Sequence, residues 1–166
     1  MIKHYSDNFF YKHNKSKIIS GINKIIASDN FTNGKEVKKF EHKFAKYNNK
    51  KYCVAVSSGT SALFLALKSL GININDEIIT TSLSFVATPM SVNYLKAKPI
   101  FVDIDPATWN IDIDKIEKKI TKKTKAILPM HFAGKLCDMD LISKIAKKYK
   151  LKIIEDCAQS YYAKIN

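Results

Sequence analysis

Short apolar segments that alternate with helix-like segments constrain the fold of this 166-residue chain more than any other feature. From residue 51 onward, runs rich in valine and isoleucine recur, and residues with helical periodicity follow each of them. Such alternation is typical of right-handed βαβ units, so we expect an α/β fold with a mostly parallel sheet and flanking helices. The predicted strands cover residues 52–56, 78–81, 99–104, 126–130 and 151–155, and the predicted helices cover 61–70, 87–97, 113–120 and 139–149.

The first fifty residues differ, because their apolar residues fall at helical spacing. Isoleucines three and four residues apart predict a helix over 15–28, and a continuous apolar face predicts a second helix over 35–47. A turn-rich break separates the two. We therefore expect an N-terminal helical segment over residues 1–50, followed by an α/β domain over residues 51–166.

The net charge of +13 raises the question of nucleic-acid binding. All 28 basic residues are lysine, and they are spread over the polar faces of the predicted helices. Base readout and bidentate clamping of phosphates depend heavily on the planar guanidinium group of arginine. We therefore expect no nucleic-acid partner, and at most a mild attraction of anionic small molecules.

The three cysteines form no CxxC pair, which is typical of reduced thiols in a cytosolic protein. The first ten residues lack the charged head and apolar core of a signal peptide. No apolar run is long enough to span a bilayer. We expect a soluble, cytoplasmic protein without a membrane partner.

The last predicted strand leads to a carboxylate, Asp156, and Gln159 follows three residues later. The carboxyl ends of parallel strands are where α/β proteins bind ligands. A partly buried carboxylate is costly unless it is paired, and a protonated pyridine nitrogen is one suitable partner, because the protonated ring is an electron sink. The alternative is a helix cap or a buried ion pair with a lysine. Asp156 alone does not distinguish these interpretations.

Two other predicted strand ends carry candidate binding residues. Gly59, Thr60 and Ser61 open the predicted helix 61–70, where free backbone N–H groups can hold a phosphate, although plain capping by serine is an alternative. Phe85 either presents its ring to a flat cofactor or packs in the core. Neither GxGxxG nor GxxxxGK[ST] occurs, which argues against dinucleotide and P-loop sites.

Taken together, these positions describe a site for a phosphorylated, flat, pyridine-type cofactor. His131 also follows a predicted strand, but no second histidine or cysteine lies at metal-ligand spacing, so we interpret it as structural and expect no metal site. The candidate cofactor-binding residues are Gly59, Thr60, Ser61, Phe85, Asp156 and Gln159.

A series of motifs runs through the chain in a fixed order. They include GKEVKKFE at 34–41, SGTSAL at 58–63, SFVAT at 84–88, PIFVDID at 99–105, HFAG at 131–134 and IEDCAQ at 154–159. With these motifs the chain resembles, from residue 31 to residue 163, the N-terminal part of sugar aminotransferases of the DegT/DnrJ/EryC1/StrS type. This is a family of fold-type I enzymes that use pyridoxal 5'-phosphate (PLP).

The resemblance implies a role for each matched position. Thr60 and Ser61 match residues that hold the PLP phosphate, and Phe85 matches the aromatic residue stacked on the pyridine ring. Asp156 matches the acid paired with the ring nitrogen, and Gln159 matches the residue near the ring hydroxyl. The family transfers an amino group, typically from glutamate, to a keto group on a nucleotide-linked sugar. Its members usually work as homodimers whose active sites are lined from both subunits.

One part of the family pattern has no match in this chain. In the family, the lysine that forms the Schiff base lies beyond the Asp-x-x-Gln motif, and Lys164 is too close to Asp156 in sequence to match it. We therefore expect no catalytic residue in this chain, and an α/β large domain over 51–166 without the later strands and the small domain. The isolated chain is expected to show no transaminase activity and to hold PLP weakly at most.

Two alternatives remain. Some relatives replace the lysine with histidine and act as PLP-dependent or PMP-dependent sugar dehydratases, and the position that separates the two activities is not matched here. The chain could instead be a non-catalytic remnant or a binding partner, because its final predicted strand, 151–155, offers an edge that another chain can pair with.

Overall fold

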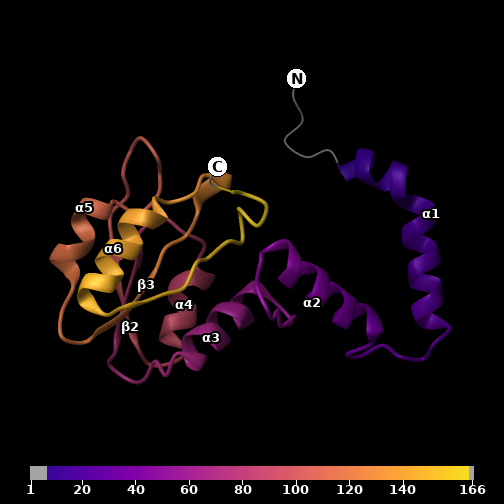
Figure 1. The fold of residues 1–166 in the computed structure, drawn as a ribbon, viewed down its shortest axis with the longest axis horizontal. Coiled ribbons are helices and arrows are strands. Elements are labelled where there is room, and N and C mark those ends of the chain that lie inside the picture. The colour runs from indigo at the N-terminus through magenta and orange to yellow at the C-terminus, as the bar shows by residue number, and fades with distance from the viewer. Residues whose placement is uncertain (1–6, 165–166) are drawn as a thin grey trace. The chain divides into compact units, whose positions relative to one another are not determined.

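The structure is a computed structural model that describes residues 7–164, with side chains described from residue 11 onward. Contacts within the chain separate two compact units, Met1–Ala55 and Val56–Asn166 (Figure 1). The assignment of 1–50 and 51–166 as domains stays a prediction. Among the described residues, no helix has both the length and the apolar character needed to cross a membrane.

The described part of the first unit contains two helices, α1 (Asp7–Ile26) and α2 (Lys35–Tyr47). Both helices were predicted, and α2 has the expected bounds, whereas α1 begins eight residues earlier than expected. Phe40 and Phe44 lie on one face of α2 with their ring centroids 5.5 Å apart. This spacing of four residues is the periodicity that predicted the helix.

The predicted strand at 52–56 is wrong, because these residues form no strand in the structure. Tyr52 and Val54 are 75% and 77% exposed, and the Ala55 N–H donates to Glu41 Oε1 at 2.8 Å instead of to a neighbouring strand. The sheet of the second unit pairs only its own four strands within the described chain. An apolar run becomes a strand only where a partner strand accepts its backbone hydrogen bonds.

The second unit is built on a four-stranded parallel sheet with the order β2-β1-β3-β4. The predicted α/β class and parallel sheet are confirmed. The strands are β1 (Glu77–Thr81), β2 (Lys98–Val102), β3 (Thr124–Leu128) and β4 (Lys152–Ile153). The helices are α3 (Gly59–Ser69), α4 (Ala87–Asn93), α5 (Ile113–Ile116), α6 (Met139–Tyr149) and the short 3-10 helices η1 (Glu117–Lys119) and η2 (Phe132–Gly134).

Helices cover both faces of the sheet (Figure 1). Successive strand residues point to opposite faces, so Ile78 belongs to the core beneath α3 and α4, whereas Ile79 belongs to the core beneath α5 and α6. Leu128 and Ile127 on β3 divide between the two cores in the same way. The sheet is therefore buried on both sides, as expected for parallel strands.

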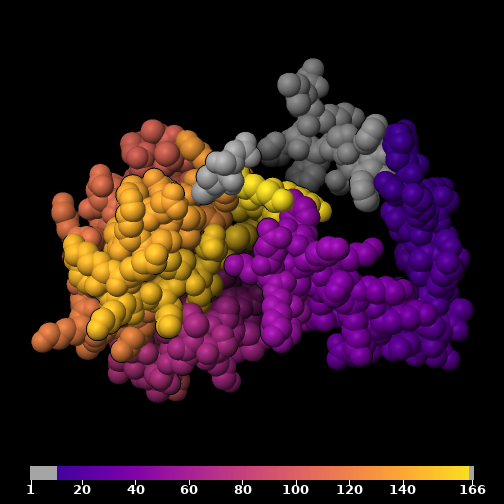
Figure 2. Space-filling model, viewed as in Figure 1, coloured from indigo at the N-terminus to yellow at the C-terminus, as the bar shows by residue number. Residues whose placement is uncertain are grey.

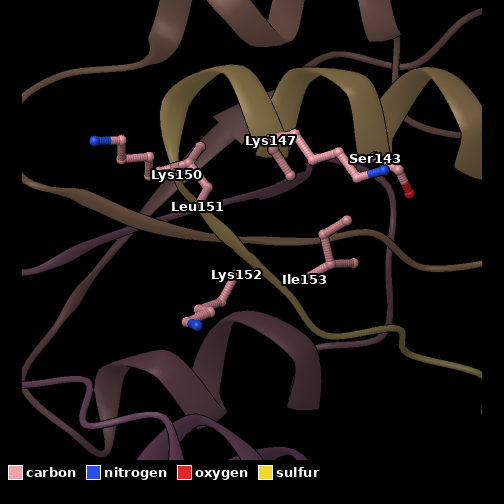
Figure 3. Close-up of a pocket in the computed structure, with 7 residues that line it drawn as sticks. Ser143, Lys147, Lys150, Leu151, Lys152 and Ile153 are labelled. Carbon is pink, nitrogen blue, oxygen red and sulfur yellow. The ribbon is translucent and has the colours of Figure 1, made fainter.

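β4 is the end strand of the sheet and is shorter than predicted. The atoms of α6 and of the segment after it lie side by side on the face shown in Figure 2. A shallow hollow of about 400 Å³ lies beside β4, with an apolar wall that includes Leu151 and Ile153 and with three lysines around it (Figure 3). The hollow lies toward the amino end of β4, whereas Asp156 follows its carboxyl end.

Candidate cofactor-binding site

Asp156 is held at the carboxyl edge of the sheet although β4 itself ends three residues earlier. The Asp156 N–H donates to Pro129 O at 2.9 Å, and the Asp156 carbonyl accepts the His131 N–H at 3.2 Å. These two bonds continue the parallel pairing of β3 and β4 beyond the regular strands. They place the Asp156 side chain among buried groups, where it is 7% exposed.

The Asp156 carboxylate accepts two hydrogen bonds. Thr88 Oγ1 donates to Oδ2 at 2.7 Å, and the Ala158 N–H donates to Oδ1 at 3.1 Å. Ala158 lies in a turn, so Asp156 caps no helix, and among the described residues no lysine forms an ion pair with it. Each carboxylate oxygen can accept a second hydrogen bond, so the group still has acceptor capacity for a ligand.

The start of α3 has the features of an anion site. Ser58 is the N-cap of α3, and its side chain accepts the Ser61 N–H at 3.1 Å. A serine therefore caps this helix, as the alternative interpretation of the sequence predicted. The N–H groups of Gly59 and Thr60 have no partner among the described residues, and the first turn contains no acidic side chain. A Cβ on Gly59 would meet nothing within 4 Å, so the backbone there is open to a phosphate. The residues therefore fit a phosphate group.

Phe85 lies in the connection between β1 and α4 and is 71% exposed. The alternative that it packs in the core is therefore wrong in this structure. Phe85 O accepts the Thr88 N–H at 3.0 Å, which fixes the turn just before the α4 residue that contacts Asp156. An exposed aromatic ring at this edge can stack on a flat ligand.

Gln159 is tied to the segment after β3. Its Oε1 accepts the Ala133 N–H at 2.7 Å, and Ala133 has a positive φ of 49° within η2. Because the amide oxygen is used, the amide nitrogen of Gln159 remains a donor without a partner among the described residues. The structure thus joins Asp156 to Thr88 and Gln159 to Ala133. Within the described part of the chain, no hydrogen bond links the Phe85 ring or the start of α3 to the side chain of Asp156 or Gln159.

Residues 12–166 match the DegT/DnrJ/EryC1/StrS aminotransferase family. The chain belongs to this family. It is 43% identical over 152 residues to a dTDP-3-amino-3,6-dideoxy-alpha-D-galactopyranose transaminase of Aneurinibacillus thermoaerophilus, a match that covers 92% of this chain and 42% of the transaminase. The predicted family membership is confirmed. The chain spans less than half the length of this relative.

Two solved structures that contain PMP or PLP share the fold of this chain. The ntda protein of Bacillus subtilis with bound cofactor pmp superposes with a TM-score of 0.87 at 42% identity, covering 89% of this chain and 34% of that one. GDP-4-keto-6-deoxymannose-3-dehydratase with a trapped PLP-glutamate geminal diamine gives a TM-score of 0.84 at 34% identity, covering 89% and 40%. The fold expected from the family resemblance is confirmed.

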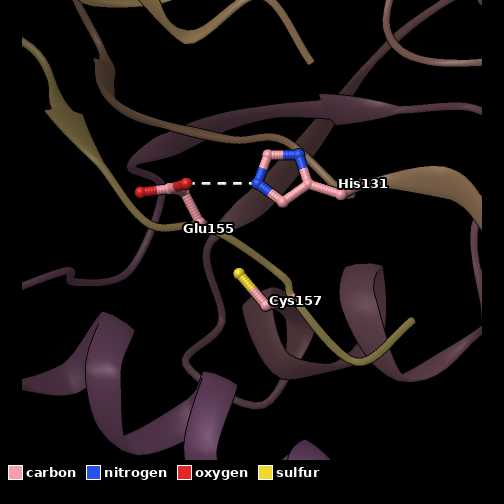
Figure 4. Close-up of side chains that lie close together, drawn as sticks. All are labelled: His131, Glu155 and Cys157. Atoms are coloured by element: carbon pink, nitrogen blue, oxygen red, sulfur yellow. Dashed lines mark hydrogen bonds and ion pairs between the residues drawn. The ribbon is translucent and has the colours of Figure 1, made fainter. Parts of the chain in front are cut away.

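A second group of polar side chains lies next to Asp156 in this chain. His131, Glu155 and Cys157 have their potential ligand atoms within 4.8 Å of one another (Figure 4). The His131 ring is fully buried, and its Nε2 lies 3.1 Å from Glu155 Oε2. The sequence did not reveal this cluster, because Glu155 and Cys157 lie in one segment and His131 lies in another.

The protonation of His131 favours a hydrogen-bonded pair over a metal site. Nδ1 accepts the Cys137 N–H at 3.1 Å, so in the neutral ring Nε2 carries the hydrogen that faces Glu155. Burial lowers the pKa of His131, but interactions with the side chains of Cys137, Cys157 and Glu155 outweigh this effect and raise the pKa. Since Nε2 carries a hydrogen in either state, it has no lone pair free for a metal ion.

Proposed function

We propose that this chain is the N-terminal portion of a PLP-dependent aminotransferase that acts on keto groups of nucleotide-linked sugars. The observation that carries the proposal is the Asp156 carboxylate, which is buried at the carboxyl edge of the sheet and held by two hydrogen-bond donors, with no lysine paired to it among the described residues. Such a group suits a protonated ring nitrogen. The nucleotide-sugar transaminase among the relatives supports the substrate class.

Each candidate residue has a role that its surroundings support. The N–H groups of Gly59 and Thr60, with the hydroxyls of Thr60 and Ser61, would hold the cofactor phosphate at the start of α3. The exposed Phe85 ring would cover one face of the pyridine, and Asp156 would accept its N–H. The free amide nitrogen of Gln159 would donate to the ring hydroxyl. When bound, pyridoxal phosphate supplies an electron sink for reactions at an amino carbon.

We place the lysine that forms the Schiff base at none of the described positions. We therefore expect the isolated chain to show no transaminase activity. Glutamate as amino donor, a homodimer as the full-length assembly and a cytoplasmic location are part of the same proposal. The net charge of +13 would favour anionic nucleotide-sugar substrates.

A sugar dehydratase is the second candidate, because the chain superposes on GDP-4-keto-6-deoxymannose-3-dehydratase. The two activities differ in the residue that meets the cofactor carbonyl. In a full-length protein, borohydride reduction that leaves the cofactor covalently attached to a lysine would support the aminotransferase. A histidine at that position, with no covalent attachment, would support the dehydratase.

The cofactor phosphate provides the first test. Pyridoxamine 5'-phosphate (PMP) needs no lysine for attachment, so the chain can bind it as it is. We expect PMP to bind about tenfold or more tightly than pyridoxamine, because hydrogen bonds to a charged group contribute about 1.5–3 kcal/mol. Equilibrium dialysis of both compounds measures the ratio. Equal affinities would contradict a phosphate site at the start of α3.

A further inference from the structure

Thr88 is a buried polar residue whose position points toward the proposed cofactor. It lies in the first turn of α4, it is fully buried, and its hydroxyl donates to Asp156 Oδ2 at 2.7 Å. The two residues are 68 positions apart in the sequence. The sequence motif SFVAT contains Thr88, but only the fold reveals its contact with Asp156.

The donor and the acceptor can be assigned in each hydrogen bond that the Thr88 hydroxyl makes. Ser84 Oγ and Thr88 Oγ1 lie 2.6 Å apart, and geometry alone leaves the donor open. The Thr88 hydroxyl has a single hydrogen, and it points to the Asp156 carboxylate, which is an acceptor. Ser84 must therefore donate to Thr88. The result is a chain of donors that runs from Ser84 through Thr88 to Asp156.

This chain of donors and the Ala158 N–H together fix the orientation of the Asp156 carboxylate. Thr88 holds Oδ2 and the Ala158 N–H holds Oδ1, so rotation about the Cβ–Cγ bond of Asp156 breaks at least one bond. The backbone of Thr88 is part of α4, and Val92, one turn later on the same helix, packs in the core. A hydroxyl that accepts a hydrogen bond is also a stronger donor.

We propose that Thr88, oriented by Ser84, is a positioning residue that aims the Asp156 carboxylate at the ring nitrogen of the cofactor. The inference rests on the proposed function, because it assumes that Asp156 pairs with that nitrogen. In this arrangement Thr88 would contact neither the cofactor nor the substrate. Thr88 acts on the cofactor only through Asp156. Its removal should therefore change the pH at which the ring nitrogen loses its proton.

The test uses PMP with an isotope-labelled ring nitrogen, bound to the 166-residue chain in excess, and follows the nitrogen by NMR as the pH is raised. Thr88→Val keeps the side-chain shape but removes the hydroxyl. We expect the bound ring nitrogen to lose its proton about one pH unit earlier than in the wild-type chain, the equivalent of one lost hydrogen bond. Ser84→Ala should give a smaller shift in the same direction, and Thr88→Ser should keep the wild-type midpoint.

Ser91→Ala is the matched control. It also removes a buried hydroxyl from α4 and a hydrogen bond to Thr88, but that bond goes to the backbone carbonyl and not to the donor chain. It should leave the midpoint unchanged, whereas a shift equal to that of Thr88→Val would reduce Thr88 to a structural role. If Thr88→Val does not fold, Ser84→Ala and Thr88→Ser still decide the point.

The same spectra separate the two proposals. A wild-type chain that binds PMP with a protonated ring nitrogen, together with a Thr88→Val variant that behaves identically, would overturn the role of Thr88 alone. A wild-type chain that does not bind PMP, or binds it with an unprotonated ring nitrogen, would overturn the cofactor site itself.

Discussion

Replacing Asp156 with alanine should weaken PMP binding by about 30-fold to several thousand-fold, because truncating one partner of a buried, hydrogen-bonded charge pair costs about 2–5 kcal/mol. The variant removes the acceptor for the ring nitrogen and leaves Thr88 Oγ1 and the Ala158 N–H without their partner. Equilibrium dialysis against PMP measures the loss. For a chain that binds weakly at the outset, binding should become undetectable.

Asp140→Ala is the matched control for this variant. Asp140 is an exposed carboxylate in the first turn of α6, so its removal changes the net charge by the same amount without touching the proposed site. PMP binding should be unaffected. Asp156→Asn keeps the size of the side chain and tests the charge if the alanine variant does not fold. Asp156 variants that bind PMP as well as the wild-type chain would exclude Asp156 as the partner of the ring nitrogen.

Replacing Leu128 with alanine should lower the free energy of unfolding by about 2–5 kcal/mol, because a fully buried leucine leaves a cavity that its neighbours only partly fill. Leu128 is fully buried on β3, which pairs with β1 on one side and with β4 on the other. Its side chain packs in the core beneath α3 and α4. A loss of this size is a large fraction of the stability of a typical domain.

Urea denaturation monitored by circular dichroism measures this loss. Leu141→Ala makes the same change at a position on α6 that is 42% exposed, and we expect it to cost about 0.5 kcal/mol or less. Similar losses for the two variants would contradict the buried position of β3 and the two-layered core around it.

The elements that sequence predicted well are those whose signals are local. The bounds of α6 follow from its amphipathic pattern and from Asp138, whose side chain accepts the Leu141 N–H at 3.0 Å as an N-cap. Both signals lie within the helix and one residue before it. The alternation of strands and helices predicted the parallel sheet for the same reason.

The elements that sequence predicted poorly depend on distant partners. Residues 52–56 have the composition of a buried strand, but pairing decides whether a strand forms, and the described chain provides no partner. The exposure of Phe85 depends on what packs over it, which composition does not show. The contact of Thr88 with Asp156 and the cluster around His131 likewise join segments that are far apart in the sequence.

The central claim is that the carboxyl edge of this sheet holds a pyridoxal-phosphate cofactor. An amide proton–nitrogen correlation spectrum of the labelled chain, titrated with PMP, tests it most directly, because it detects weak binding residue by residue. Saturable shifts are expected at the amides of Gly59, Thr60 and Ala158, with no change around Lys150. Shifts that gather at the hollow beside β4, or that never saturate at any position, would contradict it.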